Sequence, residues 1–113
     1  MAAGDWKDLL NAIFANDLAL VKYHVEGGVN VNYQHPEFLT TPLLESITQE
    51  RLEITKYLLE QGADPTLRAG FSADSPLKVA RRTGNKALIS LVKSFLPKKR
   101  SSLKWIIQQF KGS

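Results

Sequence analysis

The sequence holds few of the residues that metal or nucleophilic chemistry needs. It has two histidines, His24 and His35, and no cysteine. Neither histidine lies in an H-E-x-x-H or comparable spacing of metal ligands. The patterns G-x-x-x-x-G-K-[ST], G-x-G-x-x-G and G-x-S-x-G, which mark phosphate-binding loops and serine hydrolases, are also absent. We therefore expect a noncatalytic protein with no metal, no cofactor and no small-molecule substrate.

The charges are divided between the two halves of the chain. Residues 1–74 hold five basic and all 11 acidic residues, whereas residues 75–113 hold ten basic residues and no acidic one. Such asymmetry is a hint of an anionic partner, although attraction between the halves or solvated faces would explain it equally well. A binder of nucleic acid or anionic membrane that uses residues 78–111 is therefore our alternative function. The residues that would hold the anion are Lys98, Lys99, Arg100, Lys104, Trp105 and Lys111.

Length and composition indicate an ordinary globular protein. The chain has 113 residues, of which 43% are hydrophobic and 23% charged, enough for one domain over residues 1–113. The start, MAAGDWKDLL, lacks the basic and apolar regions of a secretory signal. No stretch approaches the roughly 18 apolar residues of a membrane-spanning helix. We expect a soluble cytoplasmic monomer.

The elements that position any functional residue recur along the chain. At an offset of 34, TPLLES at 41–46 corresponds to SPLKVA at 75–80, and GAD at 62–64 corresponds to GVN at 28–30. Self-similarity at a fixed offset is the mark of repeat architectures. We place the three copies at about 7–40, 41–74 and 75–96.

Two copies carry strong signals for the start of a helix. Thr41 and Ser75 can each accept a hydrogen bond from a free amide of a first helical turn. Pro42 and Pro76 follow at the first helical position, where the missing N–H is not needed. Both copies should therefore begin with a helix at these residues.

The second copy predicts two helices and a stop. The first should cover 43–49, and the second should cover 52–61 and end at Gly62, which can take the left-handed terminal conformation. Helix, turn, helix and long loop make an all-α repeat unit. By the same offset His24 takes the place of Leu58 on a packed helix, so we expect it to be a half-buried structural residue.

The second copy resembles the ankyrin repeat. The resemblance rests on TPL at 41–43, on RLEITKYLLEQGAD at 51–64 and on the spacing, which is close to 33 residues. With the other two copies it covers about 90 of the 113 residues. It implies an ankyrin-like helix-turn-helix solenoid that binds a protein through its loop tips and concave face. Because a chain of this size suits one partner better than many, we expect an inhibitor, immunity protein or adaptor.

Candidate partner-binding residues lie in the loops and on the outward side of the first helices. Aromatic residues and arginine dominate binding hot spots because they bury much area at low entropic cost. We expect Tyr33 and Arg68 to be exposed, while for Phe38 and Phe71 packing onto their own repeats is an equal alternative. The candidates are Phe14, Tyr33, His35, Phe38, Glu45, Thr48, Arg68, Phe71, Val79 and Arg82.

The C-terminal segment does not continue the repeat. A helix over about 101–111 would place Leu103, Ile106, Ile107 and Phe110 in one apolar stripe. The last repeat of a solenoid exposes an apolar flank that needs a cap. We therefore predict a C-terminal capping helix that packs on the third copy, with the cations on its outer face.

Overall fold

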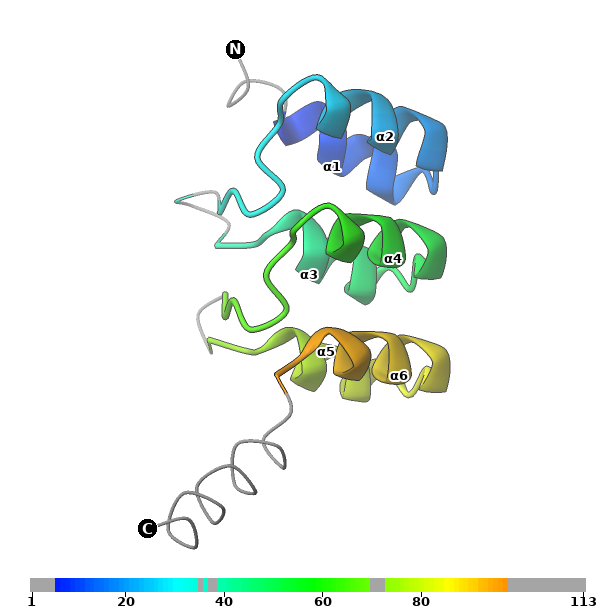
Figure 1. The fold of residues 1–113 in the computed structure, drawn as a ribbon, viewed down its shortest axis with the longest axis vertical. Coiled ribbons are helices and arrows are strands. Elements are labelled where there is room, and N and C mark those ends of the chain that lie inside the picture. Colours follow the sequence, from blue (N-terminus) through cyan, green and yellow to red (C-terminus); the bar gives the residue numbers. More distant parts are fainter. Residues whose placement is uncertain (1–5, 35, 37–38, 70–72, 98–113) are drawn as a thin grey trace, which may run out of the picture.

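In the part of the chain that the structure describes, six helices form three pairs that stack in one row. The computed structural model describes residues 6–34, 36, 39–69 and 73–97. Consecutive helices contact each other within a pair, and neighbouring pairs touch through the first helices and through the second helices (Figure 1). No strand occurs in the described residues, so this part of the chain is all-helical, as predicted. The helices are α1 (Trp6–Phe14), α2 (Leu18–Glu26), α3 (Pro42–Thr48), α4 (Leu52–Glu60), α5 (Pro76–Thr83) and α6 (Lys86–Phe95).

The predicted helix starts are confirmed. Thr41 Oγ1 accepts a hydrogen bond from the N–H of Leu44 at 3.1 Å, and Ser75 Oγ accepts one from the N–H of Lys78 at 3.2 Å. The proline that follows each cap lies in the first helical turn of α3 or α5. The bounds of α3 and α4 differ from the prediction by one residue at most at either end, within the usual fraying of helix termini.

The backbone itself repeats at an offset of 34 residues. Each turn between the two helices of a pair contains one left-handed residue: Asn16 with φ 56°, Glu50 with φ 55° and Gly84 with φ 73°. The helix-ending glycines behave alike, since Gly28 has φ 106° and Gly62 has φ 98°. An L residue with a side chain rarely takes this conformation, so its recurrence indicates that the same turn is built three times.

The core lies between the pairs. Its fully buried side chains come from every helix, so each pair helps to bury the side chains of the pairs next to it. Within the described residues, no helix is both long and apolar enough to cross a membrane. The largest fully buried hydrophobic side chains are Leu9, Ile13, Val21, Leu43, Ile47, Ile54, Leu58, Leu88 and Val92.

Polar contacts also join the first two pairs. Arg51, the residue before α4, donates from Nε to the carbonyl oxygen of Ile13 at 3.2 Å and from Nη2 to that of Phe14 at 2.7 Å. These carbonyls lie in the last turn of α1, where the regular helical donors run out; that of Ile13 also accepts a hydrogen bond from the N–H of Asn16 at 3.0 Å. The partial negative charge at a helix C-terminus also attracts a cation such as the guanidinium of Arg51. Arg51 therefore ties the N-terminus of one helix to the C-terminus of another.

Candidate partner-binding surface

One column of exposed side chains crosses all three pairs. Phe14, Thr48 and Arg82 occupy the same repeat position near the ends of α1, α3 and α5. Phe14 is 44% exposed, Thr48 is exposed, and the side chain of Arg82 is 59% exposed. We call these three residues the first-helix column. It offers an aromatic ring, a hydroxyl and a guanidinium along touching helices.

Asp74 holds the cationic end of this column. Its Oδ2 lies 3.1 Å from Nη1 of Arg82, and its Oδ1 lies 3.4 Å from Nζ of Lys78. The Asp74 side chain is only 12% exposed, while both cations are mostly in solvent. The backbone of Asp74 also exchanges two hydrogen bonds with Ala69, at 3.1 and 3.2 Å, which close the loop before α5. Sequence reasoning missed Asp74, although its spacing of four residues to Lys78 was a usable signal.

Two first-helix candidates are less available than the sequence predicted. Val79 was expected to be an apolar residue in solvent, but it is half-buried and packs against the core. Glu45 is half-buried as well, and its Oε1 accepts a hydrogen bond from Oγ1 of Thr40 at 3.1 Å. Both side chains therefore belong partly to the packing of their own repeats.

The expected exposure of Tyr33 is wrong. Its ring is half-buried against the core, with its centroid 5.8 Å from that of Trp6 and the two planes at 37°. Tilted aromatic pairs at this distance are favourable. Trp6 is the first residue of α1 and is 9% exposed. It lies just before the predicted first repeat and covers Tyr33 in the loop after α2. Tyr33 is a structural contact of this loop.

A side-chain amide joins successive loops. Asn32 Nδ2 donates to the carbonyl oxygen of Gly62 at 3.1 Å, and Asn32 Oδ1 accepts from the N–H of Asp64 at 2.8 Å. Asp64 Oδ1 in turn accepts from the hydroxyl of Thr66 at 2.7 Å and from its N–H at 2.8 Å. These two bonds from Thr66 hold the pKa of the Asp64 carboxyl below its usual value, and the bond from the hydroxyl has the larger effect. The sequence analysis did not single out Asn32.

Arg68 is exposed, as predicted, beside the third pair. Its Nη1 donates to the carbonyl oxygen of Ala73 at 3.3 Å, across the same loop that Asp74 closes. Together with Arg81, Leu77 and Leu96 it lines a hollow of about 580 Å³ at the α5 and α6 end of the stack. The hollow mixes two guanidinium groups with apolar walls.

His24 is half-buried on α2, as the repeat offset predicted. Its ring lies 5.3 Å from the ring of Tyr23 in an edge arrangement. Among the described residues, no group of three or more histidine, aspartate or glutamate side chains is placed to hold a metal ion.

Several predicted residues lie outside the described part of the chain. Among the partner-binding candidates these are His35, Phe38 and Phe71. The capping helix at 101–111 lies there too, and so do all the anion-binding candidates. These are Lys98, Lys99, Arg100, Lys104, Trp105 and Lys111.

Comparison with known proteins gives a similarity over part of the chain. No protein-family model matches the chain. A human protein named 2-5A-dependent ribonuclease is 43% identical over 60 residues, which is 53% of this chain and 8% of that protein. The chain therefore spans less than a tenth of that relative's length. The matched stretch is also shorter than two of the 34-residue units described above.

Proposed function

We propose that the chain is an ankyrin-like stack of three repeats that binds one protein partner without catalysis, as an inhibitor, immunity protein or adaptor. The first-helix column carries this proposal, because it repeats one exposed position in three touching helices. An exposed phenylalanine and an arginine are typical hot-spot residues. The all-helical fold, the backbone period of 34 residues and the 60-residue similarity support the repeat assignment.

Rigid presentation is the mechanism that we propose. Asp74 fixes Lys78 and Arg82 before any partner arrives, and Asn32 ties one loop to the next. A surface that is already ordered loses little conformational entropy when it binds. The affinity would then come from Phe14 and Arg82, with the charges steering the encounter.

Affinity capture from lysate of the source cells, followed by mass spectrometry, tests the proposal. The wild type is compared with the Phe14→Ala, Arg82→Ala double variant and with a matched control, Glu53→Ala, Lys56→Ala, on the exposed side of α4. We expect the leading captured protein to fall by about tenfold or more only in the first variant. Equal capture by all three proteins would refute the column as the binding surface.

The alternative, a binder of nucleic acid or anionic membrane, has one observation in its favour. The five cations of α5 and α6 are all exposed, and no acidic residue lies on these helices. Two of the five, Lys78 and Arg82, are already paired with Asp74, which weakens the attraction for a phosphate. Retention on heparin or acidic liposomes that falls steeply with salt would favour this alternative, and no retention at low salt would exclude it.

A further inference from the structure

The second helices carry positions that are covered in two pairs and open in the first. Leu20 of α2 is 40% exposed, while Ile54 of α4 and Leu88 of α6, at the same repeat position, are fully buried. Tyr23 of α2 is 71% exposed, while its counterpart Tyr57 in α4 is half-buried. Because these positions are covered only where a pair precedes them, their cover comes from that preceding pair.

One contact shows how this cover works. Nζ of Lys22, on α2, lies 5.6 Å from the centroid of the Tyr57 ring on α4, close enough for a cation–π interaction. Burial, followed by the charge of Glu26, raises the pKa of the Tyr57 hydroxyl. Within the described residues no helix offers Tyr23 an equivalent neighbour on that side of α2. The first pair therefore presents a stacking face that this part of the chain leaves unused.

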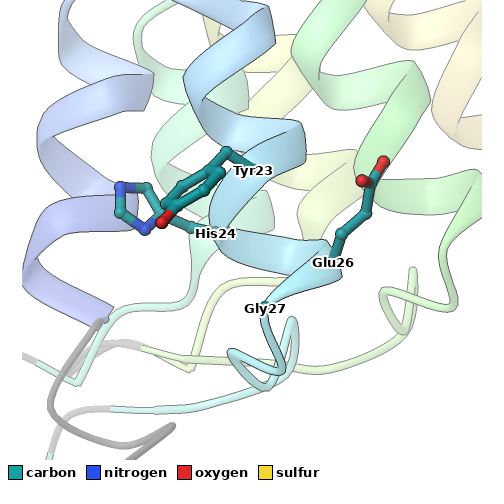
Figure 2. Close-up of a pocket in the computed structure, with 4 residues that line it drawn as sticks. All are labelled: Tyr23, His24, Glu26 and Gly27. Atoms are coloured by element: carbon teal, nitrogen blue, oxygen red, sulfur yellow. The ribbon is translucent and has the colours of Figure 1, made fainter.

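This face is hollowed and partly acidic. Figure 2 shows Tyr23 and His24 side by side on α2, with Glu26 pointing away from them at the end of the helix. They line a hollow of about 400 Å³ together with Gly27. On α1, Asp8 is exposed at the position where Pro42 and Pro76 are buried in the later pairs. We call this surface the N-terminal flank and define it as Asp8, Leu20, Tyr23 and His24. Glu26 is not part of it, because its charge acts on Tyr57, on the α4 side of α2.

We propose that residues 101–111 of one copy of the chain dock on the N-terminal flank of a second copy. The segment is predicted from sequence to be a helix with an apolar stripe of Leu103, Ile106, Ile107 and Phe110. Residues 98–113 contain five cations and no acid. A basic amphipathic helix is the complement of an open face that combines apolar side chains with a carboxylate, here that of Asp8.

The position of Pro97 favours docking between two copies over docking within one. The stack places α5 and α6 at the end opposite to α1 and α2 (Figure 1). Pro97 comes two residues after the end of α6. Three linker residues, 98–100, reach about 10 Å, whereas helix layers 8–10 Å apart put the N-terminal flank on the order of 25 Å away. The segment cannot lay its stripe on its own N-terminal flank over that distance.

The flank next to Pro97 is a poorer electrostatic match for this segment. Arg68 and Arg81 line the hollow there, and like charges that face each other oppose association. The N-terminal flank has Asp8 instead, and no cation is among its residues. The inference replaces the expectation of a monomer. Because this flank and the first-helix column are different surfaces, their tests can fail independently.

Sedimentation equilibrium of the full chain tests the inference. The weight-average mass of wild type should rise above the 12.6 kDa of one chain across about a hundredfold range of concentration. The flank variant Leu20→Lys, Tyr23→Lys should raise the apparent dissociation constant by about tenfold or more. A matched control is Phe95→Lys, since Phe95 is 39% exposed on α6, similar to Leu20, and should change nothing.

A mixing experiment identifies the occupant. The tail variant Ile106→Asp, Phe110→Asp should also lose association, because it removes the docking stripe. The flank variant keeps an intact tail, and the tail variant keeps an intact N-terminal flank. When the two variants are mixed, a one-to-one complex should therefore form. A wild type that stays at 12.6 kDa throughout would overturn the inference, and so would a tail variant that associates like wild type. If the wild type is monomeric and the tail variant differs from it only by a lower melting temperature, residues 101–111 cap the third pair of their own chain and the inference is overturned.

Discussion

Nη1 of Arg82 lies 3.1 Å from Oδ2 of Asp74, and this ion pair joins α5 to the loop that precedes it. The side chain of Asp74 is largely covered, whereas that of Arg82 stays mostly in solvent. A guanidinium held in this way is ordered and still accessible. The same residue thus serves the packing of the loop and the proposed binding surface.

Replacing Asp74 with Asn should loosen this end of the column. The two ion pairs are screened by solvent on the cation side, so we expect a loss of only about 0.5–1 kcal/mol in the free energy of unfolding. Urea denaturation measures it. A double-mutant cycle with Arg82→Ala should show coupling between the two sites, and additive effects would contradict a stabilising pair.

Replacing Arg51 with Met should destabilise the stack more. The change keeps much of the apolar stem but leaves the carbonyl groups of Ile13 and Phe14 without the donors found at 3.2 and 2.7 Å. We expect a loss of about 1–2 kcal/mol in the free energy of unfolding. Lys56→Met, on an exposed position of α4, is the control and should be nearly neutral. Equal stability of the two variants would mean that the contact of Arg51 adds nothing.

Gly62→Ala isolates the cost of the left-handed turn. A Cβ at Gly62 would meet nothing within 4 Å, so steric contact contributes no penalty, but φ is 98°. We expect a loss of about 1–2 kcal/mol from the backbone alone, measured by thermal or urea unfolding. Gln61→Ala, the exposed neighbour with φ −90°, should stay within about 0.5 kcal/mol of wild type. An unchanged Gly62→Ala variant would show that this turn relaxes freely.

Thr66→Val should raise the pKa of Asp64 toward its usual value. The variant loses the hydroxyl that donates to Asp64 Oδ1 at 2.7 Å and keeps the backbone bond. Because the folded pKa is lowered, Asp64 stabilises the fold above its unfolded pKa of about 4 and loses this effect as the pH falls through the folded value. NMR titration of the Asp64 carboxyl measures the change. An identical titration in the variant would remove the hydroxyl as a cause.

Much of the helical framework follows from local signals. Thr41 and Ser75 cap helices because their hydroxyls reach an amide three residues ahead, and this needs no distant partner. Gly62 takes a left-handed conformation for an equally local reason. The exposure of Phe14 and Arg82 followed from their place on an outward helical position.

Burial of loop residues did not follow from local signals. Tyr33 sits in a polar loop, and its cover is Trp6, 27 positions earlier in the sequence. Val79 packs against the buried core, a contact that the pattern of one helix does not reveal. The joining roles of Asn32 and Arg51 are of the same kind, since each bond spans about one repeat.

The sequence by itself determined where α3, α4 and α5 begin, where α4 ends and that the unit recurs every 34 residues, because caps, turns and apolar spacing act within a few residues. Only the tertiary structure decided which surfaces stay open. Leu20 and Ile54 occupy the same repeat position, yet one is 40% exposed and the other is buried. The difference lies in the neighbour and not in the residue, because burial in a stack is a property of adjacent pairs.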